Sequence, residues 1–463
     1  MARISFGEDG WCALQGEGFT RDALLRFADA AGRYWQSSAP GATIYIGYDT
    51  RENADESARL AAGTLAAHGM RVKLSDRPCP TPSLSWAVAH DPMAAGGLMV
   101  TGGHHRASYL GIKLRDDEGA PDGGGLSRRI LRNMGWKAPE ELGAYEQCNM
   151  VDAHLQAVAS FVDAQAIRAA RPVVVVDALF GAGQSYAAHL LEYLGAEVHE
   201  LNGRPDPRLG GAAPDPIPAR AMDCMVATSS EQAAAGYLLD GDADRVAAVC
   251  GLGQFVSPNM IMTLLMEHLV ENRGMRGRVI TSSAGSALIQ RQARRLGLPL
   301  AVVPTGYSWV WGEMARGDVL LGGEESGAIG IPAHMSERDP FVVLALLTEY
   351  MAVSGKSLPE LVAHEEEVLG RMLYARRDVA VDPVTIDVLN NVLPGVNPTN
   401  VAGRRPVAID HADGLRVTLE NDSWVLIRPS GNDMVMRVYA EAPTAEERDE
   451  LLRYGCDIVG GDK

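Results

Sequence analysis

The sequence predicts an α/β fold made of several domains, and three observations support this. The chain has 463 residues, which is too long for one hydrophobic core at roughly 100–200 residues per domain. Short apolar runs alternate with helical stretches, a pattern typical of mostly parallel sheets covered by helices. From about residue 371 the pattern changes to short alternating strands and one terminal helix, which indicates an α+β module.

The first unit starts from the apolar run IYIGYDTR. Asn53 and Glu56 then match a capping box, which predicts the start of a helix. The expected elements are a strand at 44–51, a helix to about His68, a strand at 71–75, a helix near 83–90 and a strand at 96–101.

The second and third units repeat this layout. PVVVVDALFGAG (172–183) predicts a buried strand that runs into a glycine-rich turn and a helix, and GYLLD (236–240) predicts another strand. The third unit contains the segments RVITSSAGS (278–286), LAVVPTG (300–306) and VLLGGEESG (319–327) and a helix at 285–296. Three stretches, beginning near residues 42, 172 and 277, share the order strand, polar or glycine loop, amphipathic helix, strand. This repetition indicates three related α/β domains.

The charge and composition narrow the possible partners. Lys and Arg total 42 against 59 Asp and Glu, a formal charge of −17, which argues against nucleic acid and anionic membranes as partners. An anionic ligand would need positive charge gathered locally. The six cysteines include no CxxC pair, the start MARISFGEDG lacks a signal-peptide core, and no apolar run reaches membrane-spanning length. We therefore expect a reduced, cytoplasmic protein.

An acidic loop follows the strand GYLLD. In LLDGDADRV, Asp240, Asp242 and Asp244 are spaced two residues apart, so in an extended loop their side chains point the same way. Carboxylates about 4 Å apart repel by roughly 4 kcal/mol per pair at an effective dielectric constant of 20. Such a cluster needs a cation, and hard oxygen ligands suit Mg²⁺.

This loop has two other interpretations. A helix-loop-helix calcium site is excluded, because the sixth position is Arg245 rather than glycine and the twelfth is Gly251 rather than glutamate. A solvated acidic turn without a metal stays open.

The tail contains a candidate anion site in IRPSGND (427–433). Consecutive backbone N–H groups at Ser430, Gly431 and Asn432 could form a nest for an anion. Arg428 and Arg437 add fork-shaped donors suited to phosphate. The alternative is a β-turn flanked by surface arginines.

A second polar loop, GGEESG (322–327), follows a predicted strand. Glycines allow a close approach, and Glu324 and Ser326 could hydrogen-bond the hydroxyls of a polyol. A helix-capping acidic turn fits this segment equally well.

Together these motifs resemble the α-D-phosphohexomutases, the phosphoglucomutase/phosphomannomutase family. The resemblance covers essentially the whole chain, and DGDADR, GEESG and RPSG are specific in combination. The matching segments are ISFGEDGW (4–11), YIGYDTR (45–51), PTPSLSWAV (80–88), VTGGHHRASYLGIKL (100–114), VVVDALFGAG (174–183), DGDADR (240–245), GGEESG (322–327), RPSGND (428–433) and MRVYAEA (436–442).

The resemblance implies three related mixed-sheet α/β domains plus a C-terminal α+β domain around a central cleft. The expected domains are 1–148, 149–254, 255–369 and 370–463. The family's reaction moves a phosphoryl group between O1 and O6 of a hexose through a bisphosphate. A serine carries the phosphoryl group, and Mg²⁺ bridges it to three aspartates.

The resemblance also assigns roles to residues of this chain. Asp240, Asp242 and Asp244 would bind the metal, and Arg245 would lie beside the phosphoryl group. His104 and Lys113 match acid/base groups. The residues expected to contact the sugar are Glu324 and Ser326, and those expected to hold the distal phosphate are Arg428, Ser430, Gly431, Asn432 and Arg437.

The match breaks at the catalytic serine. The family's loop usually reads Thr-Ala-Ser-His-Asn-Pro, whereas this chain reads TGGHHR at 101–106. Gly103 takes the position of the nucleophile, so no hydroxyl can carry phosphate there. Cys12 and Ser308 also replace a common arginine and a common lysine.

These departures leave several hypotheses. We favour Mg²⁺-dependent phosphoryl transfer between hydroxyls of a sugar or cyclitol phosphate without a phosphoserine, through a bisphosphate. Alternatively, His105 or His104 carries the phosphoryl group, the protein binds sugar phosphates without catalysis, or water replaces the serine in a phosphatase. The sequence does not define the oligomeric state.

Overall fold

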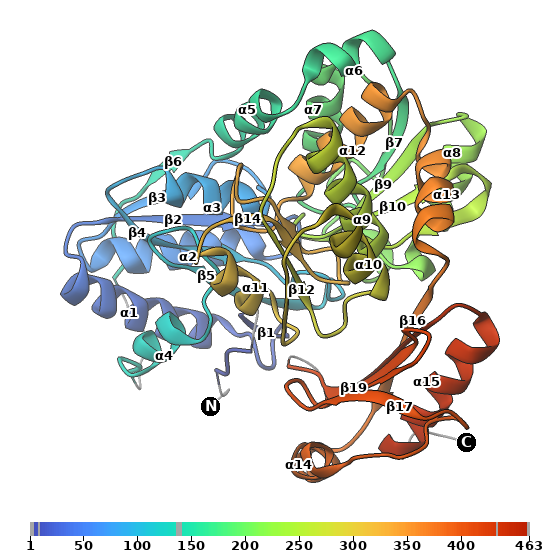
Figure 1. The fold of residues 1–463 in the computed structure, drawn as a ribbon. Helices are drawn as coiled ribbons and strands as arrows, with labels where there is room; N and C mark the ends of the chain where they lie inside the picture. The colour runs from blue at the N-terminus through green and yellow to red at the C-terminus, as the bar shows by residue number, and fades with distance from the viewer. Residues whose placement is uncertain (1–3, 8–9, 136–140, 432–433, 461–463) are drawn as a thin grey trace.

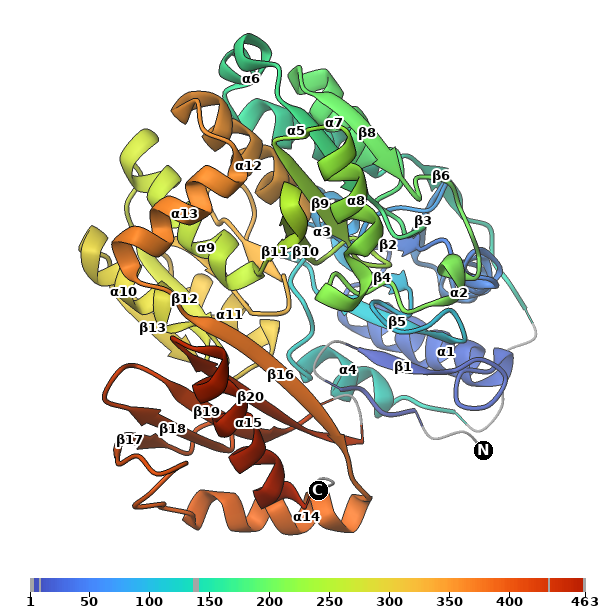
Figure 2. The ribbon, with the colours of Figure 1, turned by 90° about the vertical axis from the view of Figure 1, so that its right-hand side faces the viewer.

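The computed structural model describes residues 4–7, 10–135, 141–431 and 434–460. The chain forms four sheets in sequence order, which we use to define domains I to IV (Figures 1 and 2). Three of the sheets mix parallel and antiparallel strands and are covered by helices, and the fourth is antiparallel. The predicted fold class is therefore confirmed.

Domain I has a six-stranded sheet in the order β1-β5-β4-β2-β3-β6. Alternate residues of β2 face opposite sides, so Ile44 and Ile46 pack with α1, α2 and α4 while Tyr45 packs with α3. The elements are β1 (Trp11–Leu14), α1 (Arg21–Ser38), β2 (Thr43–Tyr48), α2 (Ala54–Ala67), β3 (Arg71–Ser75), α3 (Thr81–Ala89), β4 (Ala94–Val100), β5 (Tyr109–Arg115), α4 (Gly125–Leu131) and β6 (Glu146–Cys148).

Domain II has a five-stranded sheet in the order β11-β10-β9-β7-β8. The antiparallel pair β9 and β10 is joined by the acidic loop. The elements are α5 (Val151–Phe161), α6 (Ala164–Ala170), β7 (Val173–Asp177), α7 (Tyr186–Leu194), β8 (Glu197–Leu201), α8 (Met222–Ser230), β9 (Ala235–Leu239), β10 (Val246–Cys250) and β11 (Gln254–Val256).

Domain III has a four-stranded sheet in the order β13-β12-β14-β15. Its buried side chains form one continuous hydrophobic cluster with those of domain II. The elements are α9 (Pro258–Glu267), β12 (Arg278–Ser282), α10 (Ala287–Leu296), β13 (Leu300–Val303), α11 (Tyr307–Met314), β14 (Val319–Gly323), β15 (Ile329–Gly330), α12 (Pro340–Ser354) and α13 (Leu358–Leu369).

Domain IV has an antiparallel sheet in the order β16-β20-β19-β18-β17 and a hydrophobic cluster of its own. Figure 2 shows it below the other domains, with β16 entering from α13. The elements are β16 (Leu373–Ala380), α14 (Pro383–Val392), β17 (Pro406–Asp410), β18 (Leu415–Leu419), β19 (Trp424–Pro429), β20 (Val435–Ala442) and α15 (Ala445–Val459).

Two details of the sequence interpretation differ from the structure. The capping box at Asn53 is wrong: Asn53 has φ 65° and makes no side-chain cap, because its amide instead donates to Gln15 Oε1 at 3.0 Å. The helix after it is present. Strand β11 also extends the second sheet beyond residue 254, the expected end of the second domain; the domain boundaries themselves stay a prediction.

The length and polarity of the helices bear on membrane insertion. Within the described ranges no single helix is long and apolar enough to span a membrane. The pair α12 and α13 meets that criterion only when taken together, and the two helices are bent by 83°.

Candidate active site

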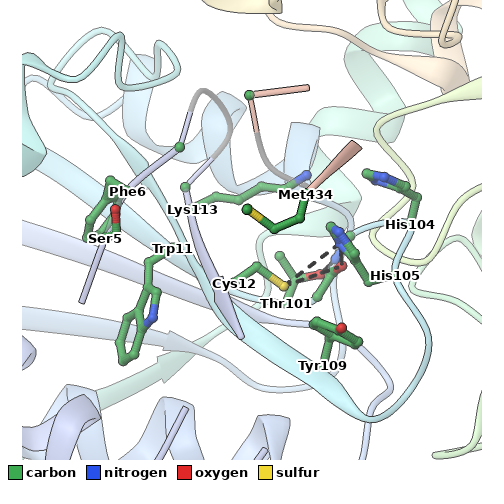
Figure 3. Close-up of a pocket in the computed structure, with 15 residues that line it drawn as sticks. Ser5, Phe6, Trp11, Cys12, Thr101, His104, His105, Tyr109, Lys113 and Met434 are labelled. Atoms are coloured by element: carbon green, nitrogen blue, oxygen red, sulfur yellow. Dashed lines mark hydrogen bonds between the residues drawn. The ribbon is translucent and has the colours of Figure 1, made fainter. Parts of the chain in front are cut away.

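Loops from all four domains line two adjoining cavities. The larger has a volume of about 480 Å³ and is lined mainly by domain I, and Met434 (Figure 3) and Gly431 of domain IV also line it. The smaller contains side chains of the acidic loop, GGEESG and the tail arginines. His104 and Gly431 line both cavities, so the two spaces are parts of one site.

The three aspartates of the acidic loop converge as predicted, although the loop is not extended. Asp240 Oδ1 accepts the backbone N–H groups of Asp244 (2.8 Å) and Arg245 (3.0 Å), and Ala243 has φ 51°. This tight turn, rather than an extended backbone, brings one oxygen of each aspartate within 4.8 Å of the others.

The chemistry of the trio fits a divalent cation. All three side chains are buried, and Asp240 Oδ2 and Asp244 Oδ1 have no hydrogen-bond partner. Burial, followed by the charges of Asp244 and Asp242, raises the pKa of Asp240 well above its usual value. Burying carboxylate oxygens without hydrogen-bond partners lowers the stability of the fold unless a cation pairs with them.

Two side-chain cations already contact the trio. Lys113 Nζ, from β5, lies 2.7 Å from Asp242 Oδ2 and 2.5 Å from Asp244 Oδ2. Arg338 Nη2 lies 2.9 Å from Asp244 Oδ2. Thr81 Oγ1 also donates to Asp242 Oδ2 at 2.6 Å. The structure thus brings the predicted Lys113 to the aspartate trio and adds Arg338 and Thr81 as further contacts.

Gly103 faces the same trio. A β-carbon at Gly103 would lie 3.7 Å from Lys113 Nζ and 3.8 Å from Asp242 Oδ1, so a side chain here would point to the acidic loop. Gly103 has φ +57°, a conformation that glycine adopts without strain. A longer side chain therefore has room, at the cost of backbone strain.

The Gly103 loop is held by a buried arginine that the sequence interpretation missed. Arg51 donates to the carbonyl oxygens of Gly103 (2.7 Å) and His105 (2.6 Å) and pairs with Asp49. Asp49 also accepts from Thr101 Oγ1 at 2.6 Å. Both residues lie in YIGYDTR. Two charged residues directly after a buried strand were the feature of the sequence that could have identified them.

The two histidines take different positions in the larger cavity. His105 Nδ1 lies 3.0 Å from Gly102 O and 3.8 Å from Cys12 Sγ, and its ring stacks on Tyr109 (Figure 3). The centre of the His104 ring is 4.4 Å from that of the His105 ring, and His104 also lines the smaller cavity. His104 is thus the histidine that lines both the larger cavity and the arginine-rich smaller cavity.

The smaller cavity gathers positive charge in an acidic chain. Arg428 is buried and Arg437 partly buried. Arg376 comes from a segment that the motif analysis did not assign to the site. The residues that line this cavity include Arg245, Arg338, Arg376, Arg428 and Arg437 together with His104, Glu324 and Ser326. Five guanidinium groups around one space fit a ligand with phosphate groups.

The tail loop differs from the expected nest. Ser430 N–H donates to Val435 O at 2.9 Å and closes the hairpin between β19 and β20, so this N–H is not part of an anion nest. Gly431 does line the cavities. Asn432 lies outside the described residues, so its role stays a prediction.

Glu324 is positioned to act as a hydrogen-bond donor. Its Oε1 accepts Gly306 N–H at 2.6 Å. Burial, followed by the charge of Glu325, raises the pKa of Glu324 to about 8. Burial thus favours the protonated carboxyl group, which can both donate to and accept from a hydroxyl group.

A second group of potential metal ligands has a structural explanation. His154 and His334 each place Nε2 about 3 Å from Asp339 Oδ2, and His154 Nδ1 meets Ser83. Burial opposes the charge on Asp339, but His154 and His334 outweigh it and lower the pKa of Asp339. This network ties α3 and α5 to the start of α12.

Fold and site together define a class of protein: a multidomain α/β protein with a buried aspartate trio that could hold a divalent cation, beside an arginine-lined cavity. Models of the phosphoglucomutase/phosphomannomutase family match the chain in four segments, namely α/β/α domain I at 3–137, domain II at 152–253, domain III at 257–368 and the C-terminal domain at 390–453. The chain belongs to this family.

Individual relatives agree over nearly the full length. A phosphoglucomutase/phosphomannomutase of Thermococcus kodakarensis is 27% identical over 98% of each chain. A phosphoglucosamine mutase of Moorella thermoacetica is 27% identical over 96% of this chain and 97% of its own. A crystal structure of a Thermus thermophilus protein assigned as a phosphomannomutase is 33% identical, with a TM-score of 0.89 and full coverage of both chains.

Proposed function

We propose that this protein is a Mg²⁺-dependent phosphomutase of a sugar or cyclitol phosphate that works through a bisphosphate without a phosphoserine. The observation that carries the proposal is the contact between the two halves of the site. The buried Asp240 trio adjoins a cavity lined by five arginines, through Arg245 and Arg338. Related mutases named for glucose, mannose and glucosamine phosphates support the substrate class.

Asp240, Asp242 and Asp244 would hold the ion. Bound there, Mg²⁺ would supply electrophilic stabilisation of a phosphoryl group in transfer. Arg245 lies at the border of this site and the arginine-lined cavity, where its guanidinium can contact the same phosphoryl oxygens. Arg428 and Arg437 would hold the second, non-reacting phosphate.

Other residues of the cavity suit the sugar and the proton transfer. Protonated Glu324 and Ser326 would hydrogen-bond ring hydroxyls. During transfer the bond from phosphorus to the donor oxygen breaks and the bond to the acceptor hydroxyl forms. His104, or Lys113 in its neutral amine form, would take the proton of that hydroxyl and return it to the departing oxygen.

Gly103 is the reason to propose a donor other than serine. We propose that Gly103 stands where the family's nucleophile stands, because a side chain there would point at Lys113 and Asp242. The space of about 480 Å³ beside it can admit the phosphate of a bisphosphate donor. The position of His105 in this cavity keeps a phosphohistidine as the alternative carrier.

The same glycine favours one other function, a sugar-phosphate binding protein without turnover. Retained cation and arginine sites with no nucleophile fit this function too. A phosphatase, with water in place of the serine, would release inorganic phosphate from the substrate alone.

A ³¹P NMR assay separates these functions. Hexose 1- and 6-phosphates are incubated with the protein and Mg²⁺, with and without the matching bisphosphate. The proposal expects interconversion of the two monophosphates only when bisphosphate is present, and its loss in Asp242→Asn. Tight calorimetric binding with no conversion would identify a binding protein, and phosphate release without bisphosphate would identify a phosphatase.

A further inference from the structure

Asp413 is a partly buried carboxylate outside every motif of the sequence. It lies in the turn between β17 and β18 of domain IV, and its side chain is 11% exposed. Its Oδ1 accepts Arg428 Nε at 2.9 Å. Its Oδ2 accepts Ser283 Oγ at 2.5 Å and Thr305 N–H at 2.9 Å. One carboxylate therefore joins Arg428 to two residues of domain III.

The partners of Asp413 place it behind the phosphate cavity. Thr305 and Arg428 both line the arginine-rich cavity, and they come from different domains. Ser283 follows β12 and Thr305 follows β13. The carboxylate thus connects the domain III wall of the cavity to the arginine that domain IV contributes.

We propose that Asp413 is a positioning residue that orients Arg428 toward the ligand's phosphate and fixes domain IV against domain III at this point. The inference rests on the proposed phosphate site and adds to it a residue that controls phosphate affinity. Asp413 holds Nε of Arg428, so the terminal nitrogens of the same planar group are the ones that meet a phosphate.

The charge state of Asp413 agrees with this role. Burial opposes ionisation, but the charge of Arg428 and hydrogen bonds from Ser283 and Thr305 outweigh it and hold the pKa of Asp413 below its usual range. Asp413 is therefore an anion across the neutral pH range, and the ion pair with Arg428 is present whenever the protein is active.

Two effects of removing this charge oppose each other. Loss of the carboxylate leaves more positive charge on the cavity wall, which favours an anion. It also releases a long side chain whose orientation must then be fixed by the ligand. We expect the second effect to prevail, because three donors already share the charge of Asp413 and a preorganised arginine loses less entropy on binding.

The chain offers a matched control at the same domain boundary. Asp422 of domain IV pairs with Arg291 of domain III at 3.0 Å, and neither residue lines the cavity. Asp422→Asn removes an ion pair between the same two domains without touching a phosphate ligand. A general loosening of domain IV would affect both variants, whereas a positioning role is specific to Asp413.

The test is calorimetric titration of the full chain with inorganic phosphate and with glucose 6-phosphate, in Mg²⁺. We expect Asp413→Asn to raise the Kd of both probes about tenfold and Asp422→Asn to leave it within about twofold. The affinity for Mg²⁺ should not change in either variant. If the protein turns over a substrate, KM should rise with kcat unchanged, as for a contact equal in ground and transition states.

Ser283→Ala gives a second readout that keeps the charge of Asp413. It removes only the hydroxyl donor, so we expect a smaller loss of affinity in the same direction. Asp413→Asn that folds and binds phosphate as well as the wild type, or tighter, overturns the inference, as does an equal loss in Asp422→Asn. A wild-type chain that binds neither probe overturns the proposed function as well.

Discussion

Gly103 is the residue on which the proposed chemistry depends. Its β-carbon direction faces Lys113 and Asp242, and among the described residues other than its chain neighbours the nearest atoms to that position are those of Lys113, at 3.7 Å. The absence of a side chain is therefore not compensated by a neighbour that fills the same place. A hydroxyl introduced there would be aimed at the proposed metal site.

Gly103→Ser should restore a phosphoryl carrier. We expect this variant to acquire a phosphoryl group from a hexose bisphosphate in the presence of Mg²⁺ and to gain mutase activity without added carrier. The left-handed backbone should cost about 1 kcal/mol of stability. Intact-mass spectrometry, coupled assays and thermal melting measure the three effects.

Gly102→Ser is the control for this substitution. A β-carbon at Gly102 would lie 2.6 Å from Tyr109 O and 2.8 Å from Arg51 Nε, so the variant should be destabilised without gaining a carrier. A folded Gly103→Ser protein with no phosphoryl adduct would show that more than the nucleophile has changed.

Lys113 makes a separate prediction about the metal. Its ammonium group contacts two aspartates of the trio, and it repels an incoming cation. Lys113→Met should bind Mg²⁺ at least tenfold more tightly, because charges about 4 Å apart interact by a few kcal/mol near a protein surface and each 1.4 kcal/mol is about tenfold in Kd. The same variant should lose turnover if Lys113 carries a proton. Weaker Mg²⁺ binding by calorimetry would instead make Lys113 a support for the acidic loop.

Sequence reasoning found the residues of the site that lie close together in the chain. The aspartate trio and the pair Glu324 and Ser326 are each contained in one loop, and local spacing was enough to identify them. Arg338, Arg376 and Asp413 come from other segments and reach the site only through domain packing. No spacing rule connects them to the motifs they contact.

At the scale of elements, the periodicity of apolar residues located helices and strands well, and caps and turns less well. Strand β7 and helix α10 lie where the apolar pattern predicts. The side-chain cap at Asn53 was predicted wrongly and the turn at Ala243 was not predicted, because both residues have left-handed backbone conformations set by neighbouring segments. The pattern of apolar and polar residues indicates which side chains are buried, but it does not indicate the backbone angle φ.

A cluster between helices α9, α10 and α13 makes stability depend on pH. Glu365 lies beside Glu267 and accepts Gln292 Nε2 at 3.0 Å. Burial, followed by the hydrogen bond and charge of Glu267, raises the pKa of Glu365 to about 9. In the unfolded state Glu365 loses its proton near pH 4.3, whereas in the folded state it keeps the proton up to about pH 9. Glu365 therefore lowers the free energy of unfolding as the pH rises between these two values.

Glu365→Gln should remove this loss. We expect the variant to be more stable than the wild type above about pH 8, by of order 1 kcal/mol, and to show a flatter stability–pH curve. Glu267 shifts in the opposite direction, so its own contribution is lost at low pH. Urea unfolding at several pH values measures the curve. Glu366→Gln, at the neighbouring partly buried position, should follow the wild type; an unchanged slope in Glu365→Gln would contradict the assignment.

At the scale of the whole molecule, the repeated layout of three α/β units and the distinct tail were sufficient to predict the four-part fold. Which units share a core was not predictable from that layout. Domains II and III form one hydrophobic cluster, whereas domain IV has its own. Domain IV contacts domain III through the small cluster of Ala284, Trp424, Leu426 and Tyr439 and through polar links such as Asp413 and Asp422.

This division predicts more than one thermal transition. Because its hydrophobic cluster is separate from theirs, domain IV should unfold before domains II and III, which should unfold together. Glucose 6-phosphate with Mg²⁺ bridges domain IV to the rest through Arg428, so at about 100 times its Kd it should add roughly 2.7 kcal/mol to domain IV. A unit of about 100 residues then melts roughly 10 °C higher, and the transitions should merge. Differential scanning calorimetry measures both profiles.

A single two-state transition without ligand, with equal calorimetric and van't Hoff enthalpies, would show that the contacts of domain IV couple it fully to the other domains.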